Sequence, residues 1–165
     1  MRSVLFIRHA KSSWDNAAVS DFDRPLNDRG KMDAPQMARR LLDKKIPLDS
    51  FISSPAKRAR KTTSFFVEAY GLAESNVLLK AELYLPSPDV FYDVIEETAN
   101  QFHHIAICSH NPAITQFVNQ LTNEIRVDNM PTCGIFAIKT NISRWEDFRK
   151  AQKQFWFFDY PKNYR

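Results

Sequence analysis

Short apolar runs alternate with stretches of helical period along this sequence, and this alternation limits the folds that the chain can adopt. Runs of strand length lie at residues 4–7, 49–53, 77–79, 104–108, 134–138 and 154–159. Between most of them, apolar residues recur every three or four positions, as on one face of an amphipathic helix. This alternation is typical of an α/β domain, and the length of 165 residues fits one domain spanning 1–165.

Local signals predict where individual elements lie. The run at residues 104–108 is apolar without alternation, which is typical of an interior parallel strand covered on both faces. We expect one helix from Gly30 onward, with Pro35 in its first turn. We expect another helix capped by Ser54 and ending at Gly71.

Glycine content excludes two large classes of nucleotide-binding protein. The chain has only three glycines, all isolated, so neither G-x-G-x-x-G nor G-x-x-x-x-G-K-[ST] occurs. Dinucleotide-binding folds and P-loop NTPases are therefore excluded. Any phosphate site must be built mainly from side chains.

Composition and pattern also bear on location and partners. No apolar run approaches the roughly 18 residues that cross a bilayer, and the N-terminus enters a strand-like segment without a signal-peptide pattern. We therefore expect a cytoplasmic protein that does not bind membranes. Cys108 and Cys133 lack C-x-x-C spacing, and we expect buried thiols rather than a disulfide or a zinc site.

Reactive side chains follow three of the predicted strands. Arg8-His9 follows the first, Ser53-Ser54 follows the second with Arg58 one turn further on, and Ser109-His110 follows the interior strand. The carboxyl ends of parallel strands meet at one edge of a sheet, where ligands bind. Because the arginine fork suits phosphate oxygens, we predict an anion site there, with a phosphoryl group as the leading ligand.

These residues carry a resemblance to a known family. The segment Arg8-His9-Ala10-Lys11-Ser12 resembles the R-H-[GA] signature of the histidine phosphatase superfamily, the phosphoglycerate mutase-like group. Further similar segments, in the same order, are S-S-P-x-x-R-A-x-x-T at 53–62, R-P-L-x-x-x-G at 24–30, the second histidine in Ser109-His110-Asn111-Pro112, and Pro161-Lys162. The short chain resembles the SixA-type phosphohistidine phosphatase branch.

The resemblance implies a fold and a mechanism. The fold would be a three-layer α/β/α domain with a mostly parallel central sheet of about six strands. His9 would be the nucleophile of a phosphatase that needs neither metal nor cofactor. Arg8 and Arg58 would clamp the phosphoryl oxygens, and His110 would add a hydrogen bond or positive charge.

The resemblance assigns roles less directly to three further residues, Asp15, Ser12 and Glu82. Many relatives have Asn six positions after the signature histidine, where this chain has Asp15, a residue that repels phosphate unless it points away. Ser12 is a candidate substrate-binding residue. Glu82 is similar in position to the superfamily's acid for the leaving group, although it would equally serve as the partner of a nearby basic residue.

Other interpretations stay open at this point. The substrate is a phosphorylated protein, with phosphohistidine favoured, or a small phosphorylated metabolite. Alternatives are a non-catalytic phosphate-binding regulatory module, and a metallohydrolase using His9, His110 and Asp15. The basic cluster at 57–61 spreads around more than one helix face, so we expect no nucleic-acid binding. The adjacent pair His103-His104 is expected to be structural.

Overall fold

Each predicted strand forms part of one sheet in the computed structural model, which describes residues 1–164. The strands are β1 (Arg2–Arg8), β2 (Ser50–Ser53), β3 (Val77–Leu79), β4 (His104–Ser109), β5 (Ile135–Thr140) and β6 (Lys153–Asp159). Their order across the sheet is β3-β2-β4-β1-β5-β6. The strands β3, β2, β4 and β1 are parallel, whereas β5 runs antiparallel to both of its neighbours. The mostly parallel six-stranded sheet is confirmed.

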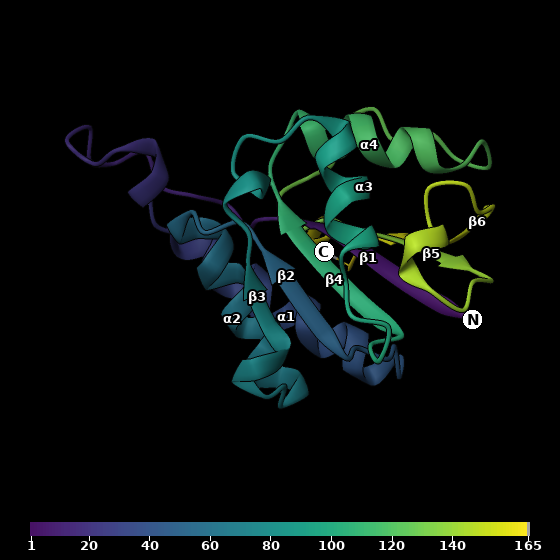
Figure 1. Cartoon of the computed structure of the whole chain (residues 1–165). Helices are drawn as coiled ribbons and strands as arrows, with labels where there is room; N and C mark the ends of the chain where they lie inside the picture. The colour runs from purple at the N-terminus through teal and green to yellow at the C-terminus, as the bar shows by residue number, and fades with distance from the viewer. Residues whose placement is uncertain (165) are drawn as a thin grey trace.

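Helices cover both faces of this sheet (Figure 1). They are α1 (Asp28–Asp43), α2 (Lys57–Tyr70), α3 (Pro88–Glu96) and α4 (Ala113–Leu121). Short 3-10 helices are η1 (Asp21–Asp23), η2 (Glu74–Asn76), η3 (Ala81–Leu83), η4 (Trp145–Asp147) and η5 (Pro161–Tyr164). The helices α1 and α2 pack on one face and α3 and α4 on the other, which confirms the three-layer fold. That residues 1–165 form one domain stays a prediction.

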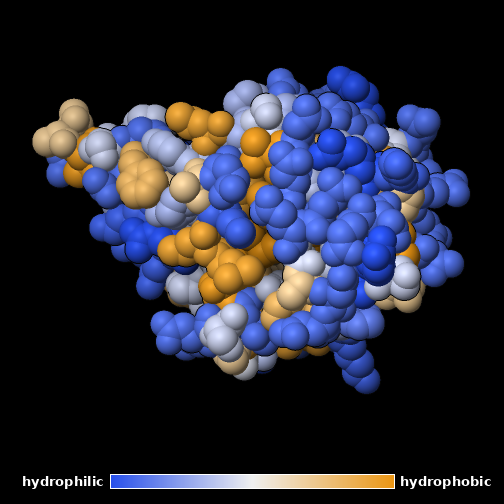
Figure 2. All heavy atoms as spheres, in the orientation of Figure 1, coloured by the Kyte–Doolittle hydropathy of each residue, from blue (hydrophilic) through white to orange (hydrophobic). Residues whose placement is uncertain are grey.

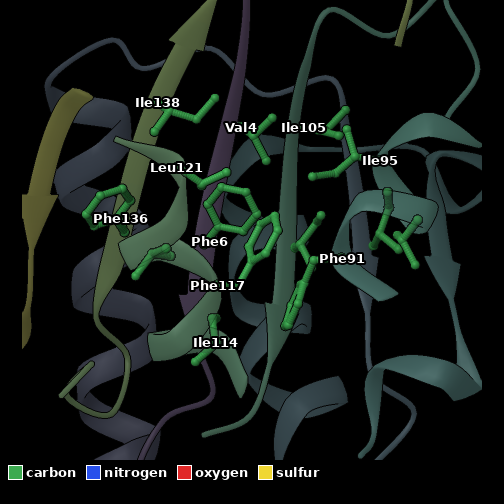
Figure 3. Close-up of a cluster of buried hydrophobic side chains, with 14 of the residues drawn as sticks. Val4, Phe6, Phe91, Ile95, Ile105, Ile114, Phe117, Leu121, Phe136 and Ile138 are labelled. Atoms are coloured by element: carbon green, nitrogen blue, oxygen red, sulfur yellow. The ribbon is translucent and has the colours of Figure 1, made fainter. Parts of the chain in front are cut away.

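Successive side chains along each strand point to opposite faces of the sheet, so the core has two layers. In β1, Val4 and Phe6 point toward α3 and α4, whereas Leu5 and Ile7 point toward α1 and α2. On the first side, Phe117 of α4 lies 5.3 Å from Phe6 between ring centroids (Figure 3). A strand with both faces buried must be apolar throughout, which is why β1 and β4 show no polar alternation.

The helix α1 begins earlier than the sequence predicted. The side chain of Asn27 accepts a hydrogen bond from the Gly30 amide at 2.9 Å, and this cap places the first helical residue at Asp28. Pro35 therefore lies inside the helix and not in its first turn, which corrects the expectation. The Asn27 cap sets where the helix begins, and this outweighs the preference of proline for the first turn.

The helix α2 begins later than predicted, at Lys57. Ser54 is not its N-cap, because the Ser54 hydroxyl accepts from the Ala56 amide in a turn and also contacts His110. The predicted end is confirmed: Gly71 adopts a left-handed conformation with a φ of 61°. The displaced start leaves Ser54 free to take part in the site described below.

One edge of the sheet is partly apolar, and both cysteines lie in the interior. The edge strand β3 exposes Leu78 and Leu79, and apolar atoms interrupt the polar surface there (Figure 2). Cys108 and Cys133 are buried free thiols as expected, and burial raises the pKa of Cys108 to about 12. Within the described residues, no helix combines the length and apolarity needed to cross a membrane.

Candidate active site

The two histidines predicted at strand ends lie side by side. The strands β1 and β4 are parallel neighbours with Arg8 opposite Ser109, so His9 and His110 follow at the same level. Their ring centroids are 5.0 Å apart, and both side chains are buried. The register of two interior strands therefore brings both imidazoles to one point at the carboxyl edge of the sheet.

Hydrogen bonds fix the tautomer of His9. Its Nδ1 lies 2.8 Å from the carbonyl oxygen of Ala10, which can only accept, so Nδ1 carries the proton. The Nε of Arg58 donates toward Nε2 of His9 at 3.4 Å, which requires a lone pair on that atom. Burial, followed by the neighbouring His110, holds the pKa of His9 well below its ordinary value. The ring is thus neutral, with an available lone pair on Nε2.

The turn after β1 is anchored by backbone groups on both sides. The Ala10 amide donates to Oγ1 of Thr62 at 2.9 Å, and that hydroxyl donates to the Arg58 carbonyl at 2.8 Å. The Cys133 amide donates to the carbonyls of both Arg8 and His9. These bonds tie the turn to α2 and to the segment before β5. The position of His9 is therefore set by rigid neighbours.

His110 is held by the turn that precedes α2. Its Nε2 lies 2.8 Å from Oγ of Ser54, and its buried Nδ1 has no hydrogen-bond partner among the described residues. Burial, and then the charge of Arg58, lowers the pKa of His110 to about 3. The ring is therefore neutral at ordinary pH, with one polar atom still to be satisfied by a ligand or solvent.

A carboxylate from η1 orients Arg58. Nη2 of Arg58 contacts Oδ2 of Asp21 at 3.1 Å, and Nη1 donates to the Asp21 carbonyl at 2.6 Å. The hydroxyl of Tyr84 donates to the same carboxylate at 2.6 Å, and Arg24 pairs with it at 3.2 Å. The hydrogen bond from Tyr84, assisted by Arg58, lowers the pKa of Asp21 to about 2. Asp21 is thus a fixed anion that aims the guanidinium at His9.

These groups line an open cleft of about 320 Å³. Among the described residues, its charged lining is Arg8, Lys11, Arg24 and Arg58 against the single carboxylate of Asp21. Two exposed apolar side chains also line it, Trp14 at 74% and Leu85 at 84% exposure. An excess of cations around a neutral imidazole suits a bound anion that the Nε2 lone pair can attack.

Residues 4–83 match the family model described as histidine phosphatase superfamily (branch 1), and this segment carries Arg8, His9 and Arg58. This segment, just under half of the chain, is therefore similar to the histidine phosphatase superfamily. An uncharacterised chloroplast protein of Arabidopsis thaliana is 32% identical over 105 residues, or 63% of this chain. The chain spans 44% of the length of that relative.

Solved structures share the histidine phosphatase fold over the full length. A protein histidine phosphatase SixA complexed with tungstate has a TM-score of 0.83 at 22% identity, with 99% of each chain covered. A mycobacterial glucosyl-3-phosphoglycerate phosphatase has a TM-score of 0.66 at 13% identity, with 97% of this chain and 98% of that chain covered. At these identities the likeness establishes the fold.

Five of the six site residues predicted from the sequence line the cleft: Arg8, His9, Ser12, Arg58 and His110. Ser12 is buried, and its hydroxyl accepts a 2.6 Å hydrogen bond from Nη1 of Arg24. It therefore positions Arg24 beside the cleft. The catalytic and binding roles assigned to these residues stay predictions.

Two acidic residues considered from the sequence lie elsewhere. Glu82 is exposed on η3, and it is not among the described residues that line the cleft. Asp15 is also exposed and outside that lining. The carboxylate that does reach the cleft is Asp21, so the structure does not bring Glu82 to the position expected for a leaving-group acid.

Asp21, Tyr84 and Arg24 are site residues that the sequence reasoning missed. Asp21 and Tyr84 are 63 positions apart and meet only in the folded protein, where η1 lies beside the end of η3. Arg24 lies in the matched R-P-L-x-x-x-G segment, which was the one available signal for it. Within residues 1–164, no group of three or more His, Cys, Asp or Glu side chains is placed to hold a metal ion.

Proposed function

We propose that this protein is a phosphatase in which His9 is the nucleophile and a phosphohistidine forms as intermediate, and that it acts on phosphohistidine-containing proteins. The observation that carries the proposal is the state of His9. Its proton is fixed on Nδ1 by the Ala10 carbonyl, and its Nε2 lone pair lies beside the guanidinium of Arg58. A nucleophile needs that lone pair, and a phosphoryl group needs that cation.

The reaction takes two steps. Nε2 of His9 forms a bond to phosphorus while the bond to the leaving group breaks, and the leaving group keeps the electron pair and takes up a proton. Water then attacks phosphorus, the bond to Nε2 breaks, and inorganic phosphate leaves. Arg8 and Arg58 neutralise the phosphoryl oxygens in both steps, and His110 supplies a further hydrogen bond.

The carboxyl content of the cleft supports phosphohistidine as the substrate class. Among the described residues that line the cleft, Asp21 is the one carboxyl group, and its pKa of about 2 makes it a poor proton donor. An alcohol leaving group needs strong acid assistance, whereas an imidazole leaves with little. A small phosphorylated metabolite with an alcohol leaving group is therefore the less favoured alternative.

The first test is hydrolysis of an aryl phosphate in the presence of EDTA. We expect turnover that persists in EDTA, is inhibited by vanadate, and falls at least about a thousandfold in His9→Ala. His103→Ala is the matched control, because His103 is exposed just before β4 and lies outside the cleft. Turnover that is lost in EDTA and restored by metal would support the metallohydrolase instead.

The second test compares substrate classes. A phosphohistidine protein is set against sugar phosphates, nucleotides, and phosphoserine and phosphotyrosine peptides at equal concentration. We expect the highest kcat/KM for the phosphohistidine protein. A near-equal response across the panel would contradict a dedicated phosphohistidine phosphatase, and no turnover of any of them would favour a non-catalytic phosphate-binding module.

A further inference from the structure

We propose that a basic pocket beside the cleft binds a second anionic group of the substrate, a carboxylate or phosphate carried on its leaving-group side. We call this pocket the side pocket; its charged lining residues are Arg8, Lys11, Arg29, Asp33 and Lys162. The inference rests on the proposed function, because it concerns the substrate of the same site. It adds a recognition element that the phosphoryl chemistry does not require.

The side pocket adjoins the cleft directly. It has a volume of about 570 Å³, and it shares Arg8, Lys11 and Thr132 with the cleft lining. Its other walls come from the first turns of α1, from Pro131 before β5, and from residues 160–162 at the C-terminal end. A molecule whose phosphoryl group is at His9 can therefore extend past Arg8 into this space, which is large enough for a small ligand.

The charge of the side pocket is strongly unbalanced. Among the described residues, four cationic side chains line it against the one carboxylate of Asp33, which is buried. Lys11, Arg29 and Lys162 are exposed and make no ion pair within the described part of the chain. Unpaired cations around a concave surface create a positive potential that favours an anion. A second acidic group on the substrate satisfies this potential.

Arg8 lines both the cleft and the side pocket. Its Nη1 donates to the Met130 carbonyl at 2.8 Å, and its buried Nε has no hydrogen-bond partner among the described residues. Burial, and then the nearby Arg58, lowers the pKa of Arg8. A second anion in the side pocket would offset this crowding of positive charge while the phosphoryl group occupies the cleft.

Hydrogen bonds from Arg40 fix the wall of the side pocket that lies opposite α1. Nη1 of Arg40 pairs with Asp159 at 3.0 Å and donates to the Tyr160 carbonyl, and Nη2 donates to the Pro161 carbonyl at 3.0 Å. These bonds fix the backbone that carries Lys162. The side pocket therefore exists before a ligand arrives, which lowers the entropic cost of binding.

A second basic surface provides a matched control. Lys31, Lys57, Arg60 and Lys61 line another hollow, of about 510 Å³, that shares no residue with the cleft. Replacing two lysines there removes the same net charge as replacing Arg29 and Lys162. General electrostatic attraction of anions is thereby separated from local recognition.

The test measures equilibrium binding to the His9→Ala protein, in which turnover is blocked. Two ligands are compared by calorimetry: 4-carboxyphenyl phosphate and 4-carbamoylphenyl phosphate, in which a neutral amide replaces the carboxylate and the phosphate is kept. We expect the carboxylate to bind about tenfold more tightly, since charge-assisted hydrogen bonds are the strong ones. Adding R29Q and K162Q should remove this preference, whereas adding K57Q and K61Q should retain it.

A peptide arm distinguishes the source of the second anion. Peptides with a non-hydrolysable phosphohistidine analogue carry Glu or Gln beside it, and binding is measured with the same variants. A preference for Glu that R29Q and K162Q remove assigns the side pocket to an acidic residue of a phosphoprotein. A preference confined to the aryl ligands assigns it to a small acidic metabolite.

No preference in either arm, or equal losses in both charge variants, would overturn the proposal. Circular dichroism checks that each variant is folded, and the single variant K162Q serves if R29Q disturbs α1. Failure of the proposed function has a separate signature, because it appears as absence of hydrolysis of both aryl phosphates by the wild-type protein.

Discussion

The protonation of two buried histidines determines what the site can do. His9 and His110 have lowered pKa values because burial penalises the imidazolium and because Arg8 and Arg58 lie close to both. A neutral His9 is the nucleophilic form, so the same burial that costs folding energy in acid keeps the lone pair of Nε2 available. Asp21 lessens the positive field without supplying a proton at neutral pH.

Stability should therefore fall as the pH drops below about 6.5, the ordinary histidine pKa. In that range the unfolded chain binds a proton at His110, while the folded protein, with a pKa of about 3, does not. By linkage, the free energy of unfolding decreases as pH falls from 6.5 toward 3. Urea unfolding at pH 7.5 and pH 5 measures this loss.

His110→Gln should show a smaller loss between these two pH values, because one depressed histidine has been removed. His103→Gln, at an exposed position, should keep the wild-type loss. An unchanged pH dependence in His110→Gln would contradict a buried, neutral His110.

At the scale of elements, the site depends on how the strand ends are joined to the helices. The start of α1 packs against the segment after β1: the Asn27 amide donates to the Lys11 carbonyl at 3.0 Å, and Ser12 pairs with Leu26 in an isolated bridge. Gly30 lies in the first turn of α1 at this contact. Gly30 thus permits a close approach between a helix and the chain that leads out of His9.

Gly30→Ala should destabilise the protein and weaken catalysis together. A Cβ there would lie 2.2 Å from the Lys11 carbonyl oxygen, so the backbone must shift. Overpacking of this kind costs about 1–3 kcal/mol, and the shift should displace Lys11 and Ser12 at the cleft. Urea unfolding and kcat/KM for an aryl phosphate measure the two effects.

Gly71→Ala is the matched control. A Cβ at Gly71 meets nothing within 4 Å, although its φ of +61° strains an alanine. It should therefore lose stability, by about 1 kcal/mol, without losing kcat/KM. Unchanged activity in Gly30→Ala, despite lost stability, would show that the contact with Lys11 has no influence on the site.

For the whole molecule, sequence pattern predicted what depends on local order and missed what depends on tertiary contact. Strands such as β4 are uniformly apolar, so their interior place in the sheet could be predicted from the sequence. The arginines and histidines of the site could be predicted because they come after the ends of such strands. The predicted start of α2 was wrong because Ser54 contacts His110 instead of capping the helix. Glu82 was predicted from its similarity in position to the superfamily's acid, and the sequence pattern does not tell that Tyr84, two positions later, lines the cleft and Glu82 does not.

Binding of a phosphate analogue should stabilise the entire fold. An anion held by Arg8, Arg58 and His110 binds only the folded state, so vanadate at about 100 times its Kd should add about 2.7 kcal/mol. For a chain of this size that corresponds to a rise in Tm of about 5–10 °C. Thermal unfolding with and without vanadate measures this rise.

Arg58→Gln should abolish the rise, whereas Arg60→Gln should keep it, because Arg60 is exposed on α2 outside the cleft. An equal rise in Arg58→Gln would place the anion elsewhere on the molecule.

Trapping the covalent intermediate tests the nucleophile most directly. The protein is mixed with a phosphohistidine protein or an aryl phosphate in EDTA, quenched in alkali during turnover, digested and mapped by mass spectrometry. We expect an acid-labile, base-stable phosphoryl group on His9, and none on His110 or His103. Steady turnover with no phosphoryl group on His9, or with one on another residue, would contradict His9 as the nucleophile.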